Sequence, residues 1–137
     1  MSDGAPAPEH RARCRCGAVT MAGRGAPLRT SVCHCRACQA RTGSAFGAQV
    51  RFRQEAITLT GETRAWRRLG DEGSICTYRF CPVCGVTCWY AIDRDPGVEA
   101  VPWGLFEDPA AFGMPATSVY EDRRWAWVRV EAGARYD

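Results

Sequence analysis

Cysteine spacing constrains this fold more than any other feature, because seven of the nine cysteines fall into three tight clusters. The clusters are Cys14 and Cys16; Cys33, Cys35 and Cys38; and Cys81 and Cys84. An odd number of cysteines fits complete disulfide pairing poorly, whereas thiolates at these spacings are typical zinc ligands. Four thiolates close a tetrahedral zinc site, while three leave one position open. The clusters therefore predict two zinc ions per chain.

The first and last clusters predict one structural zinc site. Cys14 and Cys16 form a C-x-C motif, in which an extended backbone would point both sulfurs the same way. Cys81 and Cys84 form a C-x-x-C-G zinc knuckle, whose turn brings two thiolates together and whose Gly85 lets backbone N–H groups approach the sulfurs. A zinc ion shared by these four cysteines would join the start of the domain to its middle and contribute on the order of 10 kcal/mol to folding.

The middle cluster predicts a second zinc ion with an open position. Cys33, Cys35 and Cys38 form C-x-C-x-x-C, so one loop supplies three thiolates. Three thiolates on a divalent ion give a poor Lewis acid for activating water, but they suit exchange of a fourth, soft ligand such as a thiol. Zinc lowers the pKa of a bound thiol from about 8.5, so the thiolate exists at neutral pH. His34 is expected to point away from the ion, where it either orients a sulfur or substrate group or is simply a surface residue.

Alternative assignments of these thiols remain open. The middle cluster could join the C-x-x-C knuckle at one ion and leave the C-x-C motif unused. Cys76 could instead close the second zinc site, which would remove the open position. Otherwise Cys76 and Cys88 are expected to be small, buried, apolar residues.

The bulk composition predicts one globular domain. Residues 1–11 are polar and proline-containing, so we expect a disordered tail followed by a single zinc-binding β domain over residues 12–137. No apolar run approaches the ~20 residues that span a membrane, and no signal peptide is recognisable, so a cytoplasmic protein is expected. A net charge of +3 is too weak to argue for a nucleic-acid partner by charge alone, so none is expected. The oligomeric state is not predicted.

Short segments separated by turn residues predict a mainly all-β fold of antiparallel strands with long loops. Strands are expected at residues 14–21, 46–52, 56–59, 63–67, 75–80, 86–92, 98–103 and 124–130. In the segment 75–80, Cys76 and Tyr78 share one face. Short helical turns are expected after Cys35 and over residues 109–112, where Asp108 could act as the cap. The sequence contains no nucleophile elbow, phosphate-binding glycine loop or paired carboxylate site.

The cysteine motifs together resemble those of the glutathione-dependent formaldehyde-activating enzymes, whose domain is shared with centromere protein V. The matching segments are CRCGAV from Cys14, CHCRACQARTG from Cys33 and RFCPVCG from Arg79. Looser landmarks are GLFEDP from Gly104 and the indole of Trp125. The resemblance covers roughly residues 12–130. Cys76 and Cys88 lie outside the common pattern.

The resemblance implies a tent-like fold of twisted antiparallel sheets, related to methionine sulfoxide reductase B. It implies a structural zinc at the four outer cysteines and an exchangeable, catalytic zinc at Cys33, Cys35 and Cys38. The implied reaction is that of a carbon–sulfur lyase, which condenses glutathione with formaldehyde to S-hydroxymethylglutathione.

Two functional hypotheses follow from the sequence. The favoured one is an enzyme that activates glutathione or a similar thiol on the three-cysteine zinc and adds it to a small aldehyde. Residues expected near the substrate, from their proximity to the loop or to the later landmarks, are Thr42, Gly43, Phe46 and Trp103, with Arg36 or Arg41 for a substrate carboxylate. The alternative is a non-catalytic zinc module that recognises a protein or nucleic acid.

Overall fold

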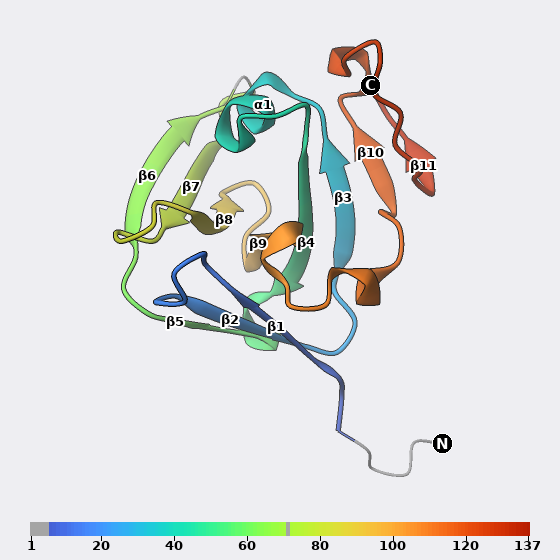
Figure 1. The fold of residues 1–137 in the computed structure, drawn as a ribbon. Coiled ribbons are helices and arrows are strands. Elements are labelled where there is room, and N and C mark those ends of the chain that lie inside the picture. Colours follow the sequence, from blue (N-terminus) through green and yellow to red (C-terminus); the bar gives the residue numbers. More distant parts are fainter. Residues whose placement is uncertain (1–5, 71) are drawn as a thin grey trace.

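The computed structural model describes residues 6–70 and 72–137, which form two β-sheets. The smaller sheet has the order β1-β2-β5 and comprises β1 (Glu9–Arg13), β2 (Thr20–Arg24) and β5 (Ile57–Thr60). The larger sheet comprises, in spatial order, β11 (Ala134–Arg135), β10 (Thr117–Val119), β3 (Arg29–Cys33), β4 (Gly47–Arg53), β9 (Val98–Pro102), β8 (Thr87–Ile92), β7 (Ile75–Phe80) and β6 (Arg64–Leu69). The two sheets lie one above the other, as Figure 1 shows.

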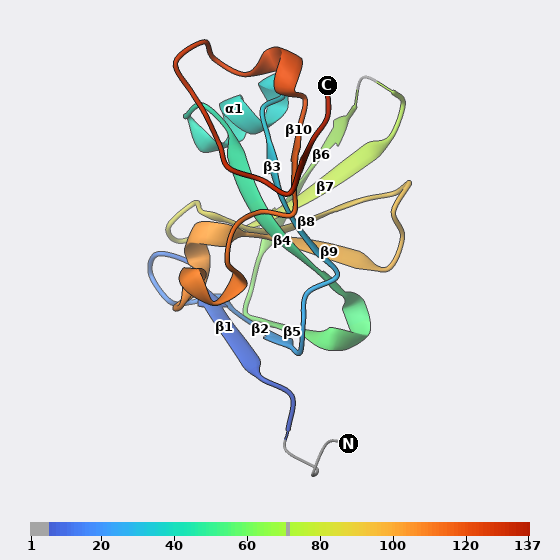
Figure 2. The same cartoon turned by 90° about the vertical axis from the view of Figure 1, so that its right-hand side faces the viewer.

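The helical content is small and lies in connections. The elements are α1 (Arg36–Thr42) and the 3-10 turns η1 (Gln54–Ala56), η2 (Trp103–Leu105), η3 (Pro109–Phe112) and η4 (Glu121–Arg123). Helix α1 connects β3 to β4 at the end remote from the small sheet, which both views show (Figures 1 and 2). No helix among the described residues is long and apolar enough to cross a membrane.

Most expected strands are confirmed, and the predicted all-β class is correct. The segment 75–80 is β7 with the predicted bounds, and the helical turns after Cys35 and over 109–112 are present. The Asp108 side chain makes no cap hydrogen bond, so that part of the expectation is wrong. Strand β10 runs parallel to both β3 and β11, so the larger sheet is mixed rather than fully antiparallel.

Three local expectations are corrected by the structure. Residues 9–11 were expected in a disordered tail but belong to β1, which pairs with β2; residues 1–5 of the expected tail lie outside the described part. Residues 14–19 form a turn with Gly17 at φ 85°, so Cys14 and Cys16 converge by turning rather than by extension. Residues 124–130 form turns instead of a strand, with Arg124 donating to backbone carbonyls of that segment.

The core fills the space between the sheets and leaves the other face of the larger sheet free for a site. Phe52 of β4 is 1% exposed and packs against the rings of Phe106 and Phe112. Met21 of β2 and Val50 of β4 belong to the same buried cluster. Since successive side chains of a strand point to opposite faces, burying Val50 and Phe52 between the sheets directs Gln49 and Arg51 toward the opposite face.

Candidate metal centre and pocket

The first cysteine cluster has the spacing of a tetrahedral zinc site. The four sulfurs of Cys14, Cys16, Cys81 and Cys84 all lie within 4.8 Å of one another. The Cys16 sulfur lies 3.7 Å from those of both Cys14 and Cys81. Four sulfurs at about 2.3 Å from a zinc ion would be separated by roughly 3.8 Å, so the donor set fits the metal.

Backbone donors around this first cluster favour thiolates. The sulfurs of Cys14 and Cys81 accept backbone N–H hydrogen bonds over 3.3 and 3.4 Å. Hydrogen bonds from the N–H groups of Val86 and Cys16 lower the pKa of Cys84 to about 6. Cys84 thus presents a charged sulfur at neutral pH, which is the form that binds a metal.

The second cluster is built by a strand, a cap and a helical turn. Cys33 ends β3, Cys35 is the N-cap of α1, and Cys38 lies in the first turn of α1. Their sulfurs lie within 4.8 Å of one another, and the N–H of Cys38 donates to the sulfur of Cys35 over 3.4 Å. Hydrogen bonds from Cys33 and Cys38 lower the pKa of the Cys35 thiol. Among residues 6–70 and 72–137, no fourth Cys, His, Asp or Glu atom joins this group.

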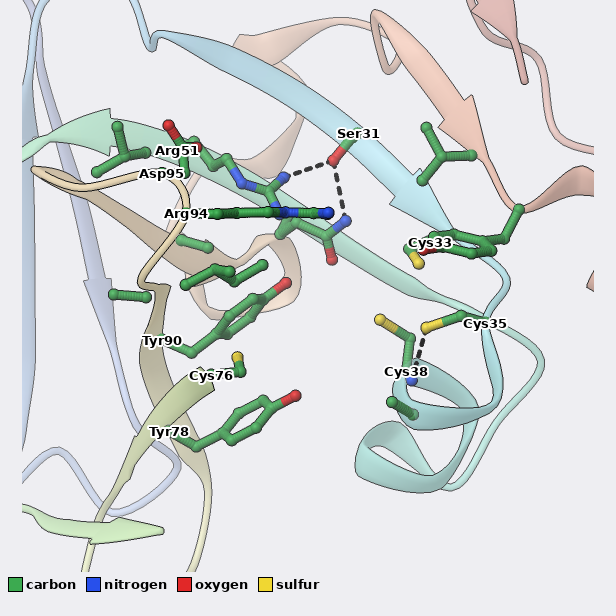
Figure 3. A pocket seen from close by; sticks show the side chains of 18 of the residues that line it. Ser31, Cys33, Cys35, Cys38, Arg51, Cys76, Tyr78, Tyr90, Arg94 and Asp95 are labelled. Atoms are coloured by element: carbon green, nitrogen blue, oxygen red, sulfur yellow. Dashed lines mark hydrogen bonds between the residues drawn. The ribbon is translucent and has the colours of Figure 1, made fainter. Parts of the chain in front are cut away.

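These three cysteines line a pocket of about 510 Å³, whereas the first cluster lies outside it. In Figure 3, Cys33, Cys35 and Cys38 stand on one side and Tyr90, Cys76 and Tyr78 face them from the other. The first side comes from β3 and α1 and the second from β7 and β8. A ligand in the pocket therefore meets three thiols on one wall and two phenols on the other.

The geometry decides between the alternative cysteine assignments. Cys76 projects from the wall opposite the three-cysteine cluster, between Tyr78 and Tyr90, and belongs to neither sulfur group (Figure 3). It is therefore not placed as a fourth ligand. Cys88 is fully buried in the core between the sheets, as expected for an apolar packing residue. The knuckle groups with the C-x-C motif and not with the middle cluster.

His34 is a buried structural residue, which corrects the expectation of a surface or substrate-facing side chain. Its ring is fully buried, and Nε2 lies 2.9 Å from Ser118 Oγ and 3.2 Å from Glu121 Oε2. Burial lowers the pKa of His34. The backbone carbonyl of His34 accepts a hydrogen bond from Gln39 of α1 over 2.8 Å. The residue thus fastens the cysteine loop to the segment after β10.

The four residues expected near the substrate do not line this pocket. Thr42 and Gly43 end α1: the Thr42 hydroxyl donates to a helix carbonyl 2.9 Å away, and Gly43 has φ 64°. The Phe46 ring packs 5.6 Å from that of His34, and the indole of Trp103 donates to a backbone carbonyl 2.9 Å away. Their role as substrate contacts stays a prediction, and each has a structural role here.

The pocket carries an excess of positive charge. Its cations are Arg29, Arg36, Arg51, Arg68 and Arg94, and its carboxylates are Glu72 and Asp95. Arg29 pairs with Asp95, and Arg94 lies 3.1 Å from Glu72. The other three have no carboxylate partner among the described residues, so the pocket suits an anionic ligand. Arg41 lies instead over the ring of Tyr90, 5.1 Å from its centroid.

Sequence reasoning missed the polar side chains of β3 and β4 that line the pocket. Arg29, Ser31 and Cys33 alternate along β3, and Gln49 and Arg51 alternate along β4. The period-two spacing that ends in Cys33 was a usable signal, because alternate residues of a strand share a face. Strand β3 was not predicted from the sequence, so the face that Arg29, Ser31 and Cys33 share was not recognised.

Comparison with known proteins agrees with this arrangement. A crystal structure of a Rhodobacter sphaeroides protein matches 75% of this chain and 94% of its own, with a TM-score of 0.58 and 19% identity, which supports the fold alone. A search of curated proteins gave no match. The sequence model of the family described as glutathione-dependent formaldehyde-activating enzyme matches residues 9–123, a range that includes all seven clustered cysteines. The chain therefore belongs to the glutathione-dependent formaldehyde-activating enzyme family.

Proposed function

We propose that this protein is a carbon–sulfur lyase that binds two zinc ions and joins glutathione to formaldehyde at the three-cysteine site. The observation that carries the proposal is the contrast between the two clusters. Four sulfurs lie together away from the pocket, whereas only three lie together on its wall, where a ligand can reach them. Cys14, Cys16, Cys81 and Cys84 would hold the structural ion, and Cys33, Cys35 and Cys38 the exchangeable one.

A zinc ion on the three thiolates would supply one chemical effect, namely a lower pKa for an incoming thiol, so that the thiolate forms at neutral pH. The other residues of the pocket position the thiol and the aldehyde. The arginines without carboxylate partners attract the carboxylates of glutathione, and the pocket holds sulfur and aldehyde close together, which makes the addition effectively unimolecular.

The addition needs one proton donor, and the tyrosine wall provides it. The thiolate sulfur attacks the carbonyl carbon, a C–S bond forms, and the C=O π electrons move to oxygen, which takes a proton. Burial raises the pKa of Tyr78 to about 12 and also raises that of Tyr90. Both phenols stay protonated at neutral pH and can donate a proton to the developing alkoxide.

Metal content and thiol binding test the proposal together. We expect two zinc ions per chain, one of which a mild chelator removes. Cys35→Ser should lose this ion, lose glutathione binding in calorimetry, and lose acceleration of S-hydroxymethylglutathione formation measured by NMR, while the circular dichroism spectrum is retained.

Cys76→Ser is the matched control, because it removes a thiol that lines the same pocket but belongs to neither cluster. It should retain both ions and glutathione binding. If both zinc ions resist the chelator and glutathione does not bind, the enzyme proposal is wrong and the non-catalytic module is favoured.

A further inference from the structure

We propose that Ser31, Gln49 and Arg51 form a subsite for the C-terminal carboxylate and the preceding peptide N–H of a thiol peptide. This inference rests on the proposed function, because the sulfur of that peptide is taken to bind at the three-cysteine site. It assigns the direction in which glutathione lies: the glycine end runs along β3 and β4, away from the cysteines.

The three side chains are held together by the pairing of β3 with β4. Ser31 lies directly opposite Gln49, and Arg29 lies opposite Arg51. Gln49 Nε2 and Arg51 Nη1 both donate to Ser31 Oγ, over 2.9 and 2.8 Å. Figure 3 shows these two bonds converging on Ser31 inside the pocket. Ser31 and Gln49 are 4% and 1% exposed and Arg51 is half-buried, so hydrogen bonds hold the group at a largely buried position in the pocket.

Each member of the group keeps hydrogen-bonding capacity that no described residue uses. Gln49 Oε1 is a buried acceptor without a partner among residues 6–70 and 72–137, and such an atom costs stability unless a ligand or water meets it. Ser31 Oγ accepts two hydrogen bonds, which leaves its own hydrogen to donate. Arg51 has no carboxylate partner in the described chain, unlike its neighbour Arg29.

This set of groups is complementary to a peptide terminus. The Arg51 guanidinium and the Ser31 hydroxyl donate to a carboxylate, and Gln49 Oε1 accepts from the peptide N–H beside it. The ammonium group at the other end of glutathione carries the same charge as the Arg51 guanidinium, which has no carboxylate partner among the described residues and would repel it.

The distance along β3 between the subsite and Cys33 agrees with placing the glycine end of glutathione at the subsite. Ser31 is two residues from Cys33 on the same face of β3, so the subsite lies about 7 Å from that cysteine along the strand. A cysteine followed by one residue with a free carboxylate spans about two residue lengths, roughly 7 Å, from sulfur to carboxylate. The γ-glutamyl carboxylate lies farther from the sulfur, because the glutamate methylenes intervene.

Chemically altered ligands test the subsite without altering the protein. Calorimetry on the zinc-loaded protein would compare glutathione with glutathione amidated at the glycine carboxylate, and Cys-Gly with cysteinylglycinamide. We expect amidation to weaken binding about tenfold or more in both pairs, as for loss of a charged hydrogen bond. An amidation effect below about threefold would overturn the subsite.

Substitutions in the protein then show which residues cause the loss of affinity on amidation. The amidation ratio is the Kd of the amidated ligand divided by that of the free carboxylate. Arg51→Gln should reduce this ratio to near one. Gln49→Glu adds a negative charge beside the carboxylate, so it should weaken the binding of glutathione more than the binding of its amide. Arg53→Gln, on the same strand but outside the pocket, is the control and should keep the native ratio. A native ratio in Arg51→Gln would contradict the assignment. If no thiol binds at all, the proposed function fails as well; if all thiols bind equally, only the subsite fails.

Discussion

At the scale of single residues, His34 decides how firmly the three-cysteine loop is held. Its ring is fully buried beside Ser118 and Glu121, and it lies between two members of the cluster. We expect His34→Ala to destabilise the fold by about 2–4 kcal/mol, because it leaves a cavity and removes a partner from buried polar groups. Urea denaturation would measure this loss.

The other histidine of the chain supplies the comparison. His10 is half-buried on β1, where its ring packs 4.6 Å from that of Phe112, and no hydrogen bond of its side chain is present among the described contacts. His10→Ala should therefore cost clearly less than His34→Ala. Equal costs would mean that the Ser118 and Glu121 contacts contribute nothing measurable.

At the scale of elements, β4 to β9 were predictable from their local sequence pattern, whereas β1, β3, β10 and β11 were not. β7 was predicted with its bounds because it alternates and is followed by a zinc knuckle. β10 and β11 are only three and two residues long and pair in parallel across the chain, so no local pattern marks them. The segment 124–130 alternates without forming a strand: Trp127 is 77% exposed, so the pattern there reflects no buried face.

The functional site was also predictable from the sequence only in part. The three cysteine clusters could be recognised from spacing alone, although only the structure shows that the first groups with the third. The pocket wall could not, since Tyr90 and Arg51 reach it through strand order rather than through sequence proximity to the cysteine loop. Proximity in sequence pointed instead to Thr42 and Phe46, which serve the helix end and the His34 ring.

Glu99 of β9 gives an element-scale prediction about pH. It is 8% exposed, one oxygen lies 3.2 Å from Gln54 Nε2, and the other has no partner among the described residues. Burial raises the pKa of this carboxyl. A raised pKa means that the folded state holds the proton more tightly than the unfolded state, so stability falls as pH rises through the folded pKa.

Glu99→Gln keeps the shape and removes the buried charge, so we expect a higher melting temperature than wild type at pH 7. The gain should shrink as pH falls toward about 4, where most of the wild-type carboxyl is protonated in both states. Melting curves across this range would measure the difference. Glu107→Gln, at an exposed position, should show no such trend; a pH-independent gain for Glu99→Gln would contradict the explanation.

At the scale of the whole molecule, the four-cysteine cluster joins the two sheets. Cys14 and Cys16 follow β1 of the smaller sheet, while Cys81 and Cys84 lie between β7 and β8 of the larger one. The buried core also packs between the sheets, and Ala12 of β1 forms an isolated bridge with Phe106, which follows η2. A metal bound here therefore links distant parts of the chain, and its binding energy adds directly to folding.

The two clusters should consequently respond differently to the same substitution. Cys81→Ser is expected to lose the structural zinc and, because such an ion contributes on the order of 10 kcal/mol, to unfold the domain or lower its melting temperature severely. Cys38→Ser should lose the other ion with only a small change in melting temperature, since its cluster lies within one strand-to-helix connection. Zinc analysis beside thermal melts would measure both. Comparable destabilisation by the two variants would show that both ions are structural, and a fully folded Cys81→Ser protein would show that the sheets hold together without the metal.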